Sequence, residues 1–340
     1  SLKGGTEFML RKRLGMLVVL LIGILLAVNT LGCKGQQVKS KYPSKPIELI
    51  VPFAPGGATD VVARPLALRL QEMWGQTVTV VNKPGGSGTV GVMEVVGAAP
   101  DGYKMLVNVT STGSLNPAVD PNLPYKWDQL THVCRINVNP LVFIVKGDSK
   151  WNGLQDVVNE LKADPTKYNY GTSGAGGPST FAIAQLCQDS GIDPTKLTRV
   201  VLGGGAAVVT AVAGGHVHLA AQNLSEVVAM IEAGKIKALA VTTPERAPQL
   251  PNVPTTKEAG FPGVTLVGWN GISGPPGLPA DVVKAWEEAV QKVCADPGFQ
   301  KEMEKAGATA AFLNQADFQK FLKEYYETGV AIAEKLGLRK

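Results

Sequence analysis

Short apolar runs alternate with glycine-rich loops and amphipathic stretches in the first third of the chain. Residues 46–51 have the pattern of a buried strand, a Gly/Pro loop follows at 52–59, and residues 60–74 carry apolar side chains at helical spacing. The same order then recurs, with strands expected at 77–81 and 104–109, a glycine-rich loop at 83–88 and a short helix at 90–99. This succession of strand, loop and helix predicts a parallel sheet covered by helices.

The pattern restarts after residue 140 and predicts a second α/β unit. Its strands are expected at 141–145, 168–170, 198–202, 219–221 and 238–241, and its helices at 154–163, 180–190 and 206–213. A strand at 264–273 and helices at 280–295, 297–306 and 315–336 complete the chain. Because open α/β sheets bind ligands beyond the carboxyl ends of their strands, two such units predict ligand recognition in a cleft between them.

The composition is that of a folded protein with two domains or lobes. The chain has 340 residues, of which 45% are hydrophobic and 18% charged, and a single core rarely grows past about 250–300 residues. The formal charge is +5, from 33 basic and 28 acidic residues. No basic cluster follows residue 40, which argues against a nucleic-acid-binding face.

The first 33 residues have the features of an export signal rather than of a fold. Residues 1–8 resemble a vector remnant, and a basic cluster then precedes an apolar run at 14–28. The signal ends in a Gly-Cys pair that resembles a bacterial lipobox, so Cys33 is the expected lipidation site and 34–42 the tether. An ordinary secretion signal and an uncleaved anchor are the alternatives, and all three export the remainder of the chain.

Three cysteines follow the signal: Cys134, Cys187 and Cys294. An odd number in an exported protein leaves at least one thiol free, and the sequence leaves any pairing open. Their long spacing lacks the CxxC pairs typical of structural zinc sites.

Two glycine-rich loops, at 52–59 and 171–179, join a strand to a helix in matching positions of the two units. Glycines let backbone N–H groups approach a ligand, and a helix N-terminus adds unpaired donors and about half a positive charge. Neither loop contains Lys or Arg. The pair therefore predicts a neutral cradle of backbone and hydroxyl donors for a carboxylate or phosphate. The plainer alternative is that the glycines serve tight turns and the hydroxyls cap helices.

Three other chemistries have weaker signals. The GxGxxG match at 86–91 follows the second strand of its unit and lacks the acidic residue expected after the next strand, which argues against dinucleotide binding. Ser173 lies in a near match to GxSxG, and a hydrolase triad would need His132, His216 or His218 beside it. His216 and His218 would share a strand face as half a metal site, but no acidic or cysteine partner lies nearby in sequence.

Asp60 and Trp269 each have two interpretations. Asp60, in the first turn of its helix, would contact the ligand or tie loops together, or it would simply oppose the helix dipole. The dipole interpretation is favoured, because a carboxylate close to a bound anion would repel it. Trp269 would wall the cleft or lie in the core.

A series of short motifs follows in order along the chain. It opens at 42–60 with YPSKPIELIVPFAPGGATD. It continues with NKPGGSG at 82–88, APDGY at 99–103, LGGG at 202–205, GGHV at 214–217, IEAGKIKALAV at 231–241, LPNVPT at 250–255 and EAGFP at 258–262. These motifs span nearly all of residues 42–336, and together they resemble the Bug-type substrate-binding proteins of tripartite tricarboxylate transporters.

The resemblance implies an α/β, two-lobed Venus-flytrap fold of the type II periplasmic-binding-protein kind, each lobe a mainly parallel sheet flanked by helices. Lobe 1 would comprise 43–138 and 268–340, and lobe 2 would comprise 139–267, with hinge crossings near 137–141 and 267–270. It also implies a monomeric receptor, not an enzyme, with no cofactor or metal, in the periplasm or on the outer face of the cytoplasmic membrane.

Members of the family are thought to grip a carboxylate through the first loop and through the Gly/Ser loop of the second lobe. Carried onto this chain and extended to the positions that would line the cleft, the expected ligand-binding residues are Phe53, Ala54, Gly57, Thr59, Asp60, Thr110, Ser111, Ser173, Gly177, Pro178, Ser179, Gly204, Asn223 and Trp269.

Four positions depart from residues that many members carry, namely Gly177, Thr180, His218 and Gln222, and they leave the distal half of the ligand open. The segments 203–205 and 268–272 favour the tricarboxylate branch. The expected function is therefore capture of a small organic di- or tricarboxylate for delivery to the large and small subunits of a membrane permease. A ligand sensor for a membrane kinase and a secreted serine hydrolase using Ser173 are the alternatives.

Overall fold

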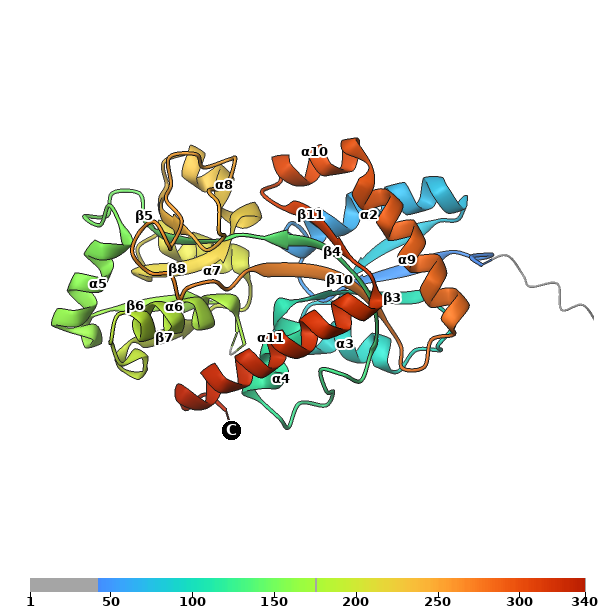
Figure 1. The fold of residues 1–340 in the computed structure, drawn as a ribbon, viewed down its shortest axis with the longest axis horizontal. Helices are drawn as coiled ribbons and strands as arrows, with labels where there is room; N and C mark the ends of the chain where they lie inside the picture. The colour runs from blue at the N-terminus through green and yellow to red at the C-terminus, as the bar shows by residue number, and fades with distance from the viewer. Residues whose placement is uncertain (1–41, 175, 340) are drawn as a thin grey trace, which may run out of the picture. The chain divides into compact units, whose positions relative to one another are not determined.

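Two β-sheets, each covered by helices on both faces, make up the computed structural model, which describes residues 42–174 and 176–339 (Figure 1). Cys33 and the expected signal, lipobox and tether up to Lys41 lie outside the described residues. Cys134, Cys187 and Cys294 are buried free thiols. None of the described helices is both long enough and apolar enough to span a bilayer.

The first sheet has six strands in the order β11-β4-β10-β3-β1-β2. Their bounds are β1 Ile47–Val51, β2 Val78–Asn82, β3 Lys104–Val109, β4 Thr131–Asn139, β10 Gly268–Gly274 and β11 Thr309–Leu313. Strands β1, β2 and β3 are parallel, whereas β10 runs antiparallel to both β3 and β4, and β11 runs antiparallel to β4. This sheet and its helices are called lobe 1 below.

The second sheet has five strands in the order β7-β6-β8-β5-β9. Their bounds are β5 Leu141–Lys146, β6 Asn169–Thr172, β7 Thr198–Val201, β8 Leu219–Asn223 and β9 Ile236–Val241. Strands β6, β7 and β8 are parallel, and β5 pairs antiparallel with β8 and β9. This sheet and its helices are called lobe 2. The two-lobed α/β class is as expected, and both sheets are mixed: the strands that lead into glycine-rich loops are parallel, and β5 and β10, which adjoin the crossings between lobes, run antiparallel to their neighbours.

Helices bury apolar stripes on both faces of each sheet. In lobe 1, α2 (Ala58–Trp74), α9 (Ala280–Ala295) and α10 (Pro297–Lys305) cover one face, and α3 (Thr89–Val96) covers the other. In lobe 2, α5 (Leu154–Ala163) and α6 (Pro178–Asp189) cover one face, and α7 (Gly205–Ala213) and α8 (Leu224–Glu232) cover the other. Strands buried on both faces explain the continuous apolar runs at β1 and β5.

Five elements named here were not expected from the sequence. Strand β4 buries His132, Asn137 and Asn139, and these polar side chains interrupt the apolar pattern of a buried strand. The wide helical turn Ser111–Leu115 and α4 (Asn116–Val119) likewise bury mainly short polar side chains and so lack apolar periodicity. Helix α8 and strand β11 are short, at 9 and 5 residues, which weakens any periodic signal.

The chain crosses between the lobes at two places and is braced by its last helix. Only Pro140 separates β4 from β5, and the return follows the segment after β9 into β10. Helix α11 (Gln315–Lys335) starts against lobe 1, where Phe318 packs on Trp269, and ends in the lobe 2 core, where Ile332 is buried with Phe181 (Figure 1). The C-terminal helix therefore contacts both lobes, although the sequence assigned it to lobe 1 alone.

The two lobes contact each other closely at three glycines. A Cβ at Gly174 would lie 2.5 Å from Ser87 Oγ of lobe 1, and a Cβ at Gly176 would lie 2.5 Å from the backbone nitrogen of Asn116. On the other side, a Cβ at Gly307 would lie 2.8 Å from the backbone nitrogen of Ser225. Real Cβ atoms do not approach so closely, so glycine at these positions permits the lobes to meet as they do in this structure.

Replacing Gly176 by alanine tests whether the ligand binds to this arrangement of the two lobes. The added methyl group would meet the backbone of Leu115 and Asn116 and resist closure, and overpacking of this kind costs about 1–3 kcal/mol. We expect ligand affinity to fall by about tenfold or more, with little change in melting temperature. Calorimetric titration measures the affinity. Gly153→Ala is the control because a Cβ there meets nothing within 4 Å, and equal affinities of the two variants would contradict the prediction.

Candidate binding site

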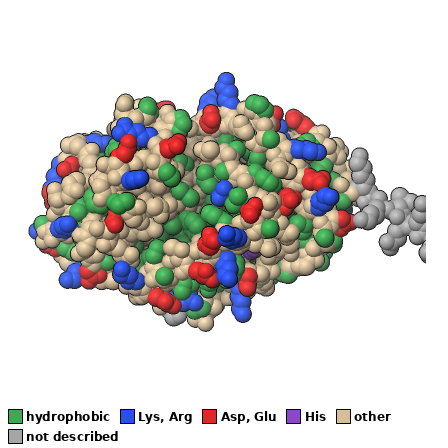
Figure 2. Space-filling view, viewed as in Figure 1, with side chains coloured by type: hydrophobic (Ala, Val, Ile, Leu, Met, Phe, Trp, Pro, Cys, Tyr) green, Lys and Arg blue, Asp and Glu red, His purple; other side chains and the backbone are tan. Residues whose placement is uncertain are grey.

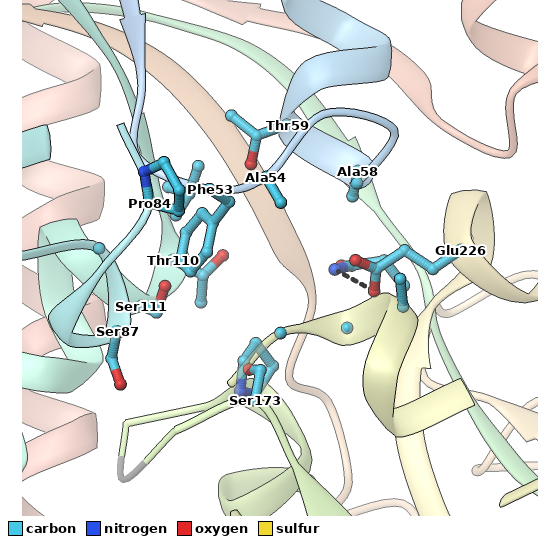
Figure 3. Close-up of a pocket in the computed structure, with 18 of the residues that line it drawn as sticks. Phe53, Ala54, Ala58, Thr59, Pro84, Ser87, Thr110, Ser111, Ser173 and Glu226 are labelled. Carbon is cyan, nitrogen blue, oxygen red and sulfur yellow. Dashed lines mark hydrogen bonds between the residues drawn. The ribbon is translucent and has the colours of Figure 1, made fainter. Parts of the chain in front are cut away.

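A cavity of about 330 Å³ lies between the lobes, where loops following strands of both sheets converge (Figure 3). Lobe 1 contributes the loop after β1, the loop after β2 and the residues after β3. Lobe 2 contributes the loops after β6 and β7 and the end of β8. The site thus lies at the carboxyl ends of the parallel strands, as the topology of open α/β sheets favours.

Five helices begin at or beside this cavity, and none of them has a side-chain cap. Helices α2, α3, α6, α7 and α8 follow the N-cap residues Gly57, Gly88, Gly177, Gly204 and Asn223, and no side chain of these residues accepts a hydrogen bond from the first turn. The first N–H groups of a helix have no partner within the helix. Together with the helix dipoles, they make the cavity attractive to an anion.

Several helices away from the cavity are capped by their own side chains. The carboxylate of Asp296 accepts a hydrogen bond at the start of α10, and the Asn314 side chain does so at the start of α11. Asp156 of α5 accepts from the N–H of Gly153. A missing cap is not confined to the cavity, since α9 follows Pro279 and also has no side-chain cap. What the five helices share is that their uncapped starts converge on one cavity.

The first loop, Pro52–Thr59, is held by Asp60, Asn82 and Arg64. Asp60, 3% exposed, accepts hydrogen bonds from the Gly56 N–H at 2.9 Å, from Asn82 Nδ2 at 2.9 Å and from Arg64 Nε at 2.8 Å. Asn82 Nδ2 also donates to the Phe53 carbonyl at 3.0 Å. Burial acts to raise the pKa of the Asp60 carboxyl, but these hydrogen bonds and the Arg64 charge outweigh it and lower that pKa. Asp60 therefore ties the loop together and does not line the cavity.

The residues after β3 join the lobe 1 wall to the crossing strand β10. Thr110 Oγ1 accepts a hydrogen bond from the Trp269 N–H at 2.8 Å. Trp269 lines the cavity, while its ring packs edge-on against Phe318 and Phe321 with centroids 5.5 and 6.0 Å away. Both interpretations of Trp269 therefore apply, since it borders the cleft and belongs to an aromatic cluster.

The second loop is stabilised from behind by hydroxyl groups. Thr172 Oγ1 donates to the Gly174 carbonyl at 3.0 Å, and Thr180 Oγ1 donates to Thr172 Oγ1 at 3.0 Å. Ser179 Oγ accepts from the Ala221 N–H at 2.9 Å, and a Cβ at Gly177 would lie 2.8 Å from Ser173 Oγ. Gly177 and Ser179 thus support the loop from behind the cavity wall, whereas Ser173 lies on the wall opposite Thr59 (Figure 3).

Eleven expected residues line the cavity: Phe53, Ala54, Gly57, Thr59, Thr110, Ser111, Ser173, Pro178, Gly204, Asn223 and Trp269. The structure adds the loop Pro84–Gly88, which the sequence predicted as a glycine-rich loop and a family motif but not as part of the binding site. Gly88 has φ +95°, and a Cβ there would lie 2.5 Å from Thr112 and 3.2 Å from Phe53, so this loop fits closely under the first one.

The structure also adds polar lining residues that were not among the expected ligand-binding residues, although Gln222 had been named as a departure from the family pattern. Asn139 Oδ1 and Gln222 Nε2 are buried without a hydrogen-bond partner, and both residues, 2% exposed, line the cavity. Glu226 lines it too and is the one ionisable residue among the described lining residues. In the sequence, Glu226 is an acidic residue in the first turn of a helix. Acidic residues are common at that position, so nothing marked it as a cavity residue.

The comparison with family models matches residues 62–338 to the tripartite tricarboxylate transporter family receptor. The chain belongs to this receptor family. A UPF0065 protein of Bordetella pertussis is 31% identical to it over 298 residues, which cover 88% of this chain and 91% of the relative. The solved periplasmic binding protein BugD is 31% identical, with a TM-score of 0.80 and coverage of 88% and 100% of the two chains. An R. palustris protein solved with adipate is 28% identical, with a TM-score of 0.82 and coverage of 87% and 98%.

The histidines of this family receptor lie away from Ser173. His132 is buried in lobe 1 between Ser273 Oγ, at 2.9 Å, and the Trp127 carbonyl, at 2.7 Å, and burial lowers its pKa to about 4. His218 contacts Asn169. No histidine stands among the described residues that line the cavity, and the described part of the chain holds no group of three potential metal ligands. Ser173 thus has no histidine base beside it on the described cavity wall.

Asp60→Asn tests the account of the first loop. The amide loses the charge-assisted hydrogen bonds from Arg64, and such bonds contribute about 1–3 kcal/mol. Because the folded pKa is lowered, the carboxylate's contribution is fully present above the unfolded pKa of about 3.9 and is lost as pH falls through the folded pKa. We expect the stability gap between wild type and variant to be constant near neutral pH and to shrink below about pH 4.

Urea unfolding monitored across pH measures this gap. Asp148→Asn is the matched control, because its ion pair with Lys146 is exposed and screened by solvent and therefore contributes little to stability. A gap that stayed unchanged down to pH 2, or an equal loss in the control, would show that Asp60 does not hold the loop electrostatically.

Proposed function

We propose that this receptor closes its two lobes on a small organic carboxylate and delivers it to a membrane permease with one large and one small subunit. The observation that carries the proposal is the convergence of five uncapped helix N-termini on one cavity. Backbone N–H groups and hydroxyls can hold a carboxylate without a cationic side chain. Membership of the receptor family supports transport as the purpose of binding.

The size of the cavity supports a small ligand. A volume of about 330 Å³ is at the lower end of the usual range for ligand pockets, which is about 300–1,000 Å³. The relative solved with adipate supports a linear acid of a few carbon atoms as the ligand class. The second carboxylate of the expected di- or tricarboxylate is considered further below.

Closure would bend the chain at the crossings near Pro140 and before Gly268, with lobe 1 comprising 43–138 and 268–340 and lobe 2 comprising 139–267. Such hinge bending is the usual response of two-lobed receptors to their ligand. We further propose that the protein acts as a monomer, anchored outside the cytoplasm through lipid on Cys33. On the face that Figure 2 shows, basic and acidic side chains are interspersed, as expected for a protein that does not bind nucleic acid.

A thermal-shift screen against organic acids tests the ligand class. The panel contains citrate, tricarballylate, malate, succinate, adipate, glutamate and aromatic acids. A ligand at about 100 times its Kd stabilises the fold by about 2.7 kcal/mol, a shift of a few degrees for a protein of this size. We expect at least one carboxylate to produce such a shift. If none does, and mass spectrometry of the denatured protein finds no copurified ligand, the carboxylate proposal is wrong.

Thr59→Ala and Ser173→Ala test the cradle, because these hydroxyls lie on opposite walls of the cavity (Figure 3). Loss of one hydrogen bond to a carboxylate costs about 1.5–3 kcal/mol, so each variant should weaken binding by about tenfold or more. Thr79→Ala, on the exposed side of β2, is the control. Calorimetric titration with the acid identified in the screen measures the effect, and unchanged affinity in both variants would place the ligand elsewhere.

A further inference from the structure

Glu226 places a carboxyl group in a cavity otherwise built to attract anions. It lies in the first turn of α8, and its carboxylate packs directly against Gly205 at the start of α7, leaving no room for a Cβ there. Asn223 Nδ2 donates to Glu226 Oε2 at 3.4 Å (Figure 3), and the Ala58 N–H of lobe 1 also hydrogen-bonds the carboxylate. Glu226 therefore sits where both lobes meet.

No cationic side chain on the described wall would balance the charge of an ionised Glu226. The other described lining residues are uncharged, and no described ion pair includes Glu226. Burial raises the pKa of the Glu226 carboxyl, and the hydrogen bonds from Asn223 and the Ala58 N–H only partly oppose this effect. The carboxylate is thus held by uncharged donors alone.

The same end of the cavity holds a second acceptor without a donor. Asn139 Oδ1 is buried and unpartnered. A Cβ at Gly268 would lie 3.2 Å from Asn139 Cβ and would also collide with the Asn223 side chain, which places Asn139 beside the residue that hydrogen-bonds Glu226. A carboxylate accepts about four hydrogen bonds, and three donors are accounted for by Asn223, with its side chain and its N–H, and Ala58. Both acceptors at this end therefore have capacity for a donor from the ligand.

We propose that Glu226 and Asn139 form a donor-selective subsite, so that the ligand is a monocarboxylate whose far end carries an ammonium, carboxamide or hydroxyl group rather than a second ionised carboxylate. The inference rests on the proposed function, since it assumes that the ligand's one carboxylate lies at the hydroxyl-rich end near Thr59, Ser111 and Ser173. It refines the expectation of a di- or tricarboxylate.

The physical reason is electrostatic repulsion between two carboxylates with no cation nearby to offset it. A second ligand carboxylate beside Glu226 would bring two negative charges together in a partly desolvated space with no cation, so a proton would have to be taken up by one of them. A carboxamide or ammonium instead donates to Glu226 and Asn139, and an amide oxygen can also accept from the unpartnered Gln222 Nε2. Specificity of this kind comes from the penalty on the wrong ligand as much as from contacts to the right one.

The test compares acids of equal chain length by calorimetric titration of the purified protein at pH 7. One series is succinate, succinamate and 4-aminobutyrate, and the other is adipate, adipamate and 6-aminohexanoate. We expect the tightest donor-bearing acid to bind at least about tenfold more tightly than the dicarboxylate of its series. A dicarboxylate that binds as tightly as its amide and amine, or a failure of all four donor-bearing acids to bind, overturns the inference.

Glu226→Gln adds a second readout, with Glu232→Gln as the matched control on the same helix, where the side chain is exposed. The glutamine removes the charge and keeps the shape, so we expect the dicarboxylate to gain affinity and the tenfold preference to vanish, whereas the control keeps the wild-type ranking. An unchanged ranking in Glu226→Gln contradicts the inference. If Glu226→Gln does not fold, the order of affinities measured on the wild-type protein decides the test alone. Failure of every acid in the larger panel is instead failure of the proposed function, whereas preference for a dicarboxylate refutes only the subsite.

Discussion

The site depends on helix donors that the fold leaves unsatisfied. Each of the five helices at the cavity follows a glycine or Asn223 and lacks a side-chain cap, while α10 and α11 are capped by Asp296 and Asn314. An N-terminal cap contributes about 0.5–2 kcal/mol, so leaving several helices without one costs stability in the unliganded protein. In the proposed function a bound anion offsets that cost for the donors that Glu226 does not already occupy, and donors of both lobes reach it only when the lobes meet around the ligand.

Other glycines, close to these helix starts, let the lobes approach. Gly174 and Gly176 meet Ser87 and Asn116, and Gly205 leaves room for the Glu226 carboxylate. The resisting element is α11, whose first turns pack in lobe 1 and whose last turns pack in the lobe 2 core. Closure of the lobes would therefore have to shift α11 as well as bend the chain at the two crossings. At the first crossing, only Pro140 separates β4 from β5.

The sequence was informative where local patterns decide the structure. Apolar runs predicted β1, β3 and β5, and glycine-rich loops predicted most of the cavity wall, because both signals are written in consecutive residues. Strand β4 escaped because its buried His132, Asn137 and Asn139 obtain their environment from distant strands. Asp60 was expected among the ligand-binding residues, but it lies off the cavity wall, because its partnership with Asn82, 22 positions away, is a product of the tertiary fold. Glu226 escaped for the same reason, since only the meeting of the lobes turns a helix-start acid into a cavity residue.

Glu226 shows how one side chain can change which ligands a site built from helix N-termini would accept. A carboxylate among helix N-termini receives the same stabilisation that a ligand carboxylate would receive, because the Ala58 N–H and the starts of α7 and α8 do not distinguish protein from ligand. The protein's own anion therefore occupies donors at one end of the cavity and leaves those near Thr59 and Ser173 for the ligand. The site can therefore stabilise less negative charge on a ligand. A cradle of partial charges without Lys or Arg can stabilise few full negative charges, and in this chain the Glu226 carboxyl group already takes up some of its donors.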